Sequence, residues 1–299
     1  MLEYKSLYNS SIVSLSDYRC SACRGGPAEE EHSSDNKIVL MRHGVFCKHV
    51  GKRIVASDVN QATFFSKGST YRVSHPADCG DRGTIFSVSP HVLNDMIHEL
   101  DPSISDHPDR PFPFVTGPCD SRTFYQHREL VTVLESVQSY PPDSLWVDEK
   151  AMLLITDVLN AAFQRTGLPK KRHRPRTDAD HIDLAEAAKS FVASRIGERV
   201  ILDDVARAVD ASPFHLARVF RRHTGMPVHR YLICLRLRTS LEQLAAGASD
   251  LTALALDLGF SSHSHFTDTF RREFGCSPSD MRHTLTRKSL REMSKNLEA

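Results

Sequence analysis

The stretch Ser212–Gly225 reads SPFHLARVFRRHTG, and the stretch Ser261–Gly275 reads SSHSHFTDTFRREFG. A histidine, a phenylalanine, two arginines and the final glycine recur at a constant offset, with His215 and His265 separated by 50 positions. Self-similarity at a fixed offset marks an internal repeat, in which one small structural unit occurs twice. We therefore expect the second half of the chain to contain two copies of the same helical unit.

Each copy has the pattern of a helix-turn-helix motif: a short helix, a tight turn, and a second helix that ends at glycine. In the first copy Ser212 can cap the second helix, and Pro213 suits its first turn, where no N–H donor is required. In the second copy Gly259 permits the turn and Ser261 or Ser262 provides the cap. Residues at buried spacing in the two copies are Leu202, Val205, Ala206, Val209, Leu216, Val219 and Phe220, then Leu251, Leu254, Ala255, Leu258, Phe266, Thr269 and Phe270.

A single long helix is predicted between the two copies. It opens at Pro227, runs to about Ala246 and is stopped by Gly247. Its apolar stripe is broad enough to pack against both flanking motifs. The stripe consists of Val228, Tyr231, Leu232, Leu235, Leu241, Leu244 and Ala245. We expect this helix to act as a spacer between the motifs.

Two helix-turn-helix motifs joined by one helix, each closing with Phe-Arg-Arg-x-x-Gly, resemble the DNA-binding domain of the AraC/XylS family of bacterial transcription regulators. The resemblance covers residues 182–284. It implies a regulator, not an enzyme, that binds double-stranded promoter DNA and contacts RNA polymerase. A helical bundle with merely solvated charged faces is the alternative, but a repeat in register with capping residues at both turns argues against it.

The resemblance also assigns positions to DNA. Those expected in the major groove are Phe214, Ala217 and Arg218 in the first motif, and His263, Ser264, Thr267 and Asp268 in the second. Arg218 suits the commonest specific contact, to guanine, whereas Asp268 departs from the basic or amide residue common at its position. The remaining interface candidates are Ser212, Arg221, Arg222, Arg271 and Arg272, the arginines being placed for phosphates or for salt bridges within each motif.

Charge divides the chain of 299 residues into unlike halves, although its net charge is only +1. Residues up to Pro169 include 16 Lys and Arg against 21 Asp and Glu, and residues from Lys170 onward include 22 against 16. The basic half is the half that carries the repeat, as binding to phosphates requires. The length is sufficient for two ordinary domains.

Composition places the boundaries of these domains. We expect a sensor domain at 1–168, a basic linker at 169–180, the DNA-binding domain at 181–285 and a polar tail at 286–299. The linker is rich in Lys and Arg and nearly free of apolar residues. Asp183, followed three positions later by Glu186, predicts a capping box that opens the next helix.

Short runs rich in β-branched and aromatic residues, separated by turn residues, fill positions 37–88. Their spacing favours a small β-barrel or jelly roll. This region is similar to the cupin-like regulatory domains of the same family, so the fold class is α+β with two domains and a barrel that can enclose a small-molecule effector. Two helices, at 121–138 and 148–164, are expected to form a hairpin that either pairs two subunits into a homodimer or covers its own barrel.

Polar residues on or beside the strands are candidate effector contacts: Arg24, His32, Arg42, Arg72 and His75, with Arg72 and His75 first. A cupin-type metalloenzyme is the rival hypothesis. It would require a His-x-His pair on a strand, but His43, His49 and His75 are isolated from one another. The sequence therefore favours a regulator over an enzyme.

Cys20 and Cys23 form a Cys-x-x-Cys pair, which can bind zinc or act as a redox couple. A regulator that responds to metal or to thiol oxidation through these residues is thus an alternative, and ordinary reduced thiols are the plainer interpretation. A full zinc site would need further ligands from Cys47, Cys79, Cys119 or His75.

The first residues, Met1 to Arg19, have no apolar core of the kind found in signal peptides or membrane spans. The chain has seven cysteines, an odd number that does not suggest a disulfide scaffold. A reducing cytoplasm is the expected location, with no resident cofactor apart from the zinc alternative.

Overall fold

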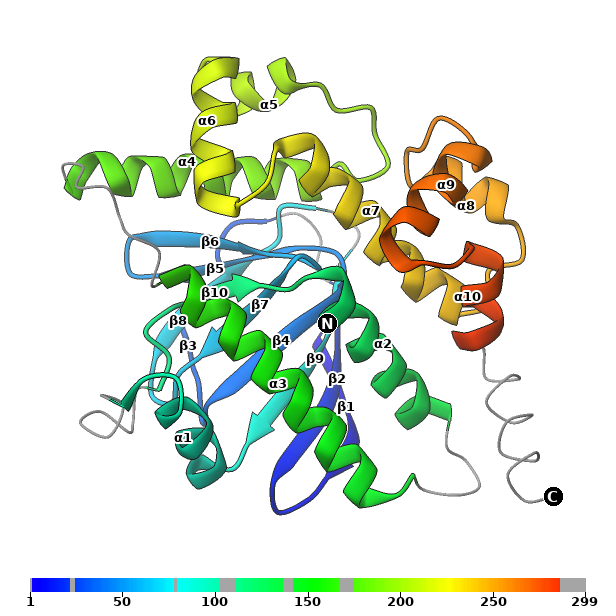
Figure 1. The fold of residues 1–299 in the computed structure, drawn as a ribbon. Coiled ribbons are helices and arrows are strands. Elements are labelled where there is room, and N and C mark those ends of the chain that lie inside the picture. The colour runs from blue at the N-terminus through cyan, green and yellow to red at the C-terminus, as the bar shows by residue number, and fades with distance from the viewer. Residues whose placement is uncertain are drawn as a thin grey trace.

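The computed structural model describes residues 2–21, 25–77, 80–102, 111–136, 142–166 and 175–285 (Figure 1). Strands occupy the first part of the chain, and helices the second. The strands are β1 (Leu2–Asn9), β2 (Val13–Cys20), β3 (Glu31–His32), β4 (Lys37–His43), β5 (Phe46–Val50), β6 (Arg53–Ser57), β7 (Gln61–Phe65), β8 (Thr70–Ser74), β9 (Asp81–Val88) and β10 (Thr116–Pro118).

The strands form two antiparallel sheets, one in the order β1-β2-β9-β4-β7-β10 and one in the order β3-β8-β5-β6. Among the strands that the structure describes, no ladder joins the two sheets, so the closed cupin-like barrel expected from the sequence is replaced by two open sheets. The edge of β6 is covered by a helix instead of being paired: the Ala56 N–H donates to the Glu186 carboxylate over 2.9 Å. A polar side chain can satisfy an edge strand in this way without a further strand.

The helices are α1 (Pro90–His98), α2 (Ser121–Ser136), α3 (Ser144–Thr166), α4 (Pro175–Ala193), α5 (Leu202–Ala208), α6 (Pro213–Thr224), α7 (Val228–Ala245), α8 (Leu251–Asp257), α9 (His263–Phe274) and α10 (Pro278–Leu285). Both predicted helices of the hairpin are present, as α2 and α3 (Figure 1). The α+β class is therefore confirmed at this coarser level.

Helix α3 packs closely on the first sheet. A Cβ added at Gly117 on β10 would lie 2.5 Å from the Cβ of Ala162, so the glycine is what allows the helix backbone to approach the strand. The apolar stripe predicted for this helix, including Leu154 and Val158, is buried. The stripe therefore covers the chain's own sheet.

Helix α4 begins earlier than the sequence analysis expected. Its first residue is Pro175, so residues 175–180, assigned to the basic linker, are helical, and Asp183 lies inside the helix instead of capping it. Proline is favoured in the first turn of a helix because its missing N–H would have no partner there. The rest of the predicted linker, up to residue 174, lies outside the described residues, as does the tail at 286–299.

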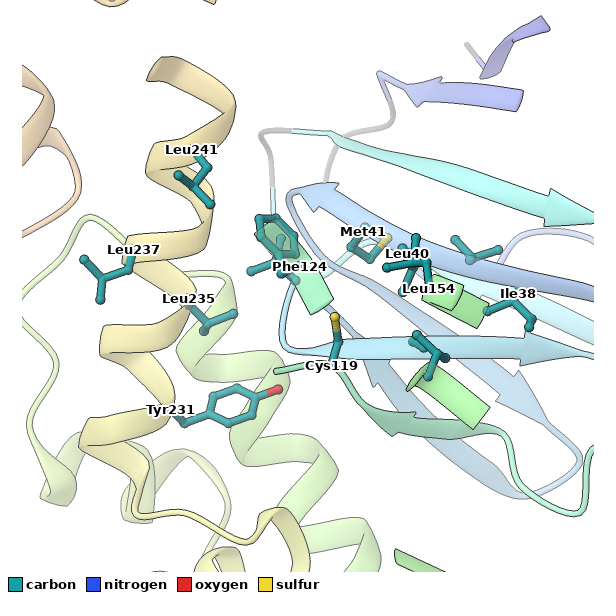
Figure 2. Close-up of a cluster of buried hydrophobic side chains, with 14 of the residues drawn as sticks. Ile38, Leu40, Met41, Cys119, Phe124, Leu154, Tyr231, Leu235, Leu237 and Leu241 are labelled. Carbon is teal, nitrogen blue, oxygen red and sulfur yellow. The ribbon is translucent and has the colours of Figure 1, made fainter. Parts of the chain in front are cut away.

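Helix α7 has the predicted extent, with Pro227 as its N-cap and Gly247 just past its C-cap in a left-handed conformation. It is not amphipathic, however: every residue from Tyr231 to Leu241 is buried. Figure 2 shows why, because Tyr231 and Leu235 turn toward the sheet side around Cys119 while Leu237 points the opposite way. The spacer helix is thus also the element that docks the helical half onto the sheets.

Candidate DNA interface

The first helix-turn-helix motif is α5 and α6. The Ser212 hydroxyl accepts a hydrogen bond from the His215 N–H at 3.2 Å, which caps α6, and Gly225 ends it with φ of 82°. Leu216 and Phe220 are fully buried, as the repeat predicted. The turn between the helices contains Asp210 with φ of 49°, a left-handed conformation that aspartate tolerates better than most residues.

The second motif, α8 and α9, repeats this construction. Of the two predicted caps Ser262 is the one used, accepting from the His265 N–H at 3.1 Å, and Gly275 ends the helix with φ of 78°. Gly259 supplies the turn with φ of 77°. Because both copies use the same cap and the same stop, α6 and α9 begin and end at equivalent positions and expose equivalent faces.

The residues assigned to DNA by sequence lie mainly on the solvent-facing sides of these two helices. Those classed as exposed are Ser212, Phe214, Arg218, Arg221, Arg222, His263, Ser264, Asp268, Arg271 and Arg272, while Ala217 and Thr267 are half-buried. Phe214 is 78% exposed, which is unusual for a large apolar side chain. Together with Ala217 and Arg218 it lines a groove of about 1000 Å³ between α5, α6 and the start of α7.

Arg236 fixes the two motifs relative to each other. Its guanidinium donates to the carbonyl oxygens of Ile196 and Glu198 beyond α4, each at a distance between 2.7 and 2.8 Å, and to that of Gly259 in the second turn at 2.7 Å. Two carbonyl oxygens from the segment between α4 and α5, and one from the turn of the second motif, thus accept hydrogen bonds from one buried guanidinium. The planar fork of arginine, with five N–H donors, suits this role.

The strands and helices α1 to α3, within residues 2–166, are here called the sheet domain. A cluster of ion pairs, here called the Glu242 cluster, joins α7 to this domain. Its members are Asp17, Arg42, Arg82, Arg128, Glu135 and Glu242. The Glu242 carboxylate lies 3.0 Å from Arg42, 2.8 Å from Arg82 and 2.9 Å from Arg128. Burial alone would raise the pKa of Glu242, but the guanidiniums of Arg128 and Arg42 outweigh it and lower the pKa to about 2.

A second contact region lies at the other side of the same interface. Glu186 of α4 accepts from the Ala56 N–H of β6 and pairs with His223 of α6 at 3.0 Å. Burial would raise the pKa of Glu186, but Lys189 and His223 lower it to about 2. The Tyr231 hydroxyl of α7 donates to the Asp58 carboxylate. The first motif therefore rests on the sheet domain through charged as well as apolar contacts.

Sequence reasoning missed these interface residues. The sequence predicts Glu186 in a capping box, whereas in the structure it contacts Ala56 and His223; for Glu242 there is no prediction. The available signal was the position of charged residues, because Arg236, Arg238 and Glu242 lie among the apolar residues of α7. Charged residues that are buried are almost always paired, so such interruptions indicate a second partner surface.

The candidate effector contacts do not converge on one pocket. Arg42 is fully buried in the Glu242 cluster, with all of its nitrogens engaged by carboxylates. Arg72 is half exposed near Glu30, and His32 is exposed on β3. His75 lies apart from them beside Asp81, and Arg24 falls outside the described residues.

Of the two cysteines assigned as metal or redox candidates, the structure describes Cys20. Cys20 lies 3.4 Å from the His75 ring, whereas Cys23 and Cys79 fall outside the described residues. Cys47 points to Ser190 on α4, and burial raises the pKa of the Cys119 thiol to about 12. Among the described residues, His75 is the further zinc ligand offered by the sequence that lies beside Cys20.

None of the helices in the described segments is both long and apolar enough to cross a membrane.

The sequence is similar to those of known transcription regulators. Residues 205–284 match the family model for a helix-turn-helix domain. The chain is 29% identical over 261 residues to the HTH-type transcriptional activator RhaS of Escherichia fergusonii, covering 86% of this chain and 88% of that protein. It is 30% identical over 105 residues to the regulatory protein SoxS of Salmonella typhimurium, covering 35% of this chain and 98% of that protein. A crystal structure of apo ToxT from Vibrio cholerae aligns over 93% of this chain and 99% of that chain with 13% identity and a TM-score of 0.41. By these relatives and its doubled motif, the chain belongs to the AraC/XylS family of transcription regulators.

Proposed function

We propose that this regulator reads two successive major grooves of promoter DNA with α6 and α9. The observation that carries the proposal is the equivalence of the two helices, which share their serine cap, their glycine stop and the position of their exposed faces. A recognition helix of this kind places its first turns against base edges. Phe214, Arg218, His263 and Asp268 occupy those turns and are solvent-exposed.

The length of α7 supports the spacing that this binding mode needs. The helix has 18 residues, which corresponds to about 27 Å at 1.5 Å per residue. Figure 1 shows α5 and α6 toward its beginning and α8 to α10 toward its end. Two motifs held this far apart can meet grooves about 34 Å apart, one turn of the double helix, once the widths of the motifs are included.

On each recognition helix, some residues contact bases and others contact phosphates. Arg218 donates two hydrogen bonds to guanine, and Asp268 accepts from cytosine, which are the pairings that their geometry allows. Ser212, Arg221, Arg222, Arg271 and Arg272 contact phosphates and fix the register without reading sequence. Ala217, Ser264 and Thr267 complete the base-facing surface by apolar contact and hydrogen bonding.

The sheet domain supplies the signal. An effector bound there changes the docking of α7 through the Glu242 cluster, and so changes how the motifs sit on DNA. Exposed Leu145 and Leu153 on α3, at 76% and 57%, offer a surface on which two chains form a homodimer. The promoter-bound chain then contacts RNA polymerase.

The test begins with mapping of the sites that the protein occupies on its own genome by crosslinking and sequencing. We expect enrichment at promoters that share a motif of two parts about one helical turn apart. The affinity of the purified full chain for such a site is then measured by fluorescence anisotropy, at fixed salt because phosphate contacts make affinity salt-dependent. Inserting about half a turn of DNA between the two parts should reduce binding to the level of a single half-site.

Arg218→Ala should cost about 1–3 kcal/mol at the mapped site and relax base preference in one half-site. Arg207→Ala is the matched control, because Arg207 is an exposed arginine on α5, paired with Asp204 and away from the recognition helix. It removes the same charge and should change affinity much less. Equal effects of the two variants, or a site that tolerates the half-turn insertion, would contradict the proposed reading geometry.

A further inference from the structure

Three unlike metal-binding side chains meet beside the sheet domain's first sheet. Cys20 is the last residue of β2 and pairs in register with Asp81, the first residue of β9, while His75 follows β8 directly. The Cys20 Sγ lies 3.4 Å from the His75 Nε2, and that nitrogen lies 2.9 Å from the Asp81 Oδ2. All three donor atoms lie within 4.8 Å of one another.

The backbone around this cluster leaves little freedom. Gly80 has φ of 67°, and a Cβ there would lie 2.4 Å from the Cys20 carbonyl oxygen. A Cβ at Gly44, whose φ is 77°, would lie 2.2 Å from the Gly80 carbonyl oxygen and 2.8 Å from the Cα of Asp81. Only glycine permits these approaches without strain. Cys20 and Asp81 are therefore held at fixed positions, as a preorganised binding site requires.

The Asp81 carboxylate is buried beside the His75 imidazole. Its side chain is 2% exposed, and its Oδ2 accepts no hydrogen bond from the described residues. The His75 Nε2 lies 2.9 Å from this oxygen, so one cation can be bound by both atoms and would compensate the burial of the carboxylate.

We propose that Cys20, His75 and Asp81 bind one divalent transition-metal ion of the zinc class. Ligands at about 2.0–2.3 Å in a tetrahedral arrangement lie roughly 3.3–3.8 Å from one another, so the present spacings need only small side-chain adjustments. A thiolate and a carboxylate balance the charge of a divalent ion, and imidazole and thiolate select zinc over magnesium or calcium. Three protein donors leave a fourth coordination position for water or another donor.

The site adjoins the interface between the two halves of the chain. Arg82, which follows Asp81, pairs with Glu242 of α7 at 2.8 Å. An ion that holds Asp81 therefore also restrains the start of β9, which carries Arg82 of the Glu242 cluster. The metal site itself does not depend on the proposed DNA-reading mode, and its test requires no DNA.

The test uses the full chain, reduced and freed of metal with a chelator, and titrated with Co²⁺ as a spectroscopic substitute for zinc. We expect one equivalent to give the intense visible bands of a tetrahedral ion and a near-ultraviolet band from sulfur-to-cobalt charge transfer, both abolished by equimolar Zn²⁺. Cys20→Ser should remove the charge-transfer band. His75→Gln should weaken binding by at least about 100-fold, since even a supporting partner is commonly worth 10–100-fold.

Cys276→Ser is the matched control, because Cys276 is also a partly exposed thiol but lies in the helical half. It should leave spectrum and affinity unchanged. Failure of the unaltered chain to give a tetrahedral cobalt spectrum would overturn the proposal, whatever the variants do. A Cys20→Ser protein that keeps the charge-transfer band, with a normal far-ultraviolet circular dichroism spectrum, would overturn the assignment of the thiol.

Discussion

Glu242→Gln should destabilise the protein by about 3 kcal/mol at neutral pH. Glu242 is the single acidic residue of α7, and its carboxylate is shared by Arg42, Arg82 and Arg128. Its pKa is lowered from an ordinary value of 4.5 to about 2, and each pKa unit corresponds to about 1.36 kcal/mol of preference for the charged form. The same magnitude is expected from breaking a buried ion pair by removing one partner, roughly 3–5 kcal/mol.

The sign of the pH dependence follows from the direction of the shift. Because the folded protein lowers the pKa of Glu242, its stabilising contribution is complete above about pH 4.5 and is lost as the pH falls toward 2. The difference in the free energy of unfolding between the original protein and Glu242→Gln should therefore be constant from pH 7 to about 5 and shrink below that. Urea-induced unfolding, followed by circular dichroism at several pH values, measures this difference.

Glu149→Gln provides the comparison for this experiment. Glu149 lies exposed on α3, and removing its charge should change stability by less than about 0.5 kcal/mol. A loss below about 1 kcal/mol for Glu242→Gln, or a difference from the original protein that does not diminish on acidification, would refute the argument that this carboxylate is held charged between the two halves.

Two further predictions concern α7 and α3. Arg236→Ala should cost about 3 kcal/mol of stability, because it leaves the Ile196, Glu198 and Gly259 carbonyl oxygens without their charged donor. In anisotropy titrations it should also weaken binding to a two-part DNA site more than binding to one half-site. Equal weakening of both would count against the role of Arg236 between the motifs. Leu153→Glu should convert the proposed dimer into a monomer, because Leu153 is 57% exposed on α3 and is expected to lie between the two chains. Sedimentation velocity measures the change. If the unaltered chain is itself a monomer at the same concentration, the proposed pairing is wrong.

The helix-turn-helix motifs were predictable because their determinants are local. Ser212 caps a helix that begins at the next residue, and Gly225 ends it in a left-handed conformation. Each of these residues therefore acts on the helix that it borders. The same holds for Ser262 and Gly275. Hydrophobic spacing at 3.6 residues then predicted most of the buried positions, such as Phe220 and Phe270, but Leu202, which was also expected to be buried, is 39% exposed.

The sheet arrangement and the docking of α7 were not predictable in this way. Whether β6 pairs with another strand or is covered by a helix depends on Glu186, which is 130 positions from its partner Ala56. Likewise, the burial of Glu242 depends on Arg42, 200 positions away. Strand periodicity specifies which residues face a core, but not which edges meet or which charges pair across the chain.

The charges of the Glu242 cluster argue that the two halves of the chain depend on each other. The sheet domain alone contributes three guanidiniums, Arg42, Arg82 and Arg128, but only two carboxylates, Asp17 and Glu135. Arg42 and Arg128 are at most 1% exposed with α7 docked, and without Glu242 the three guanidiniums would have only two carboxylates in the cluster. Docking of α7 supplies the missing carboxylate. Undocking breaks the ion pairs of Glu242 with Arg42, Arg82 and Arg128 as well as the apolar contacts of α7, so a signal that separates the halves must offset the loss of both.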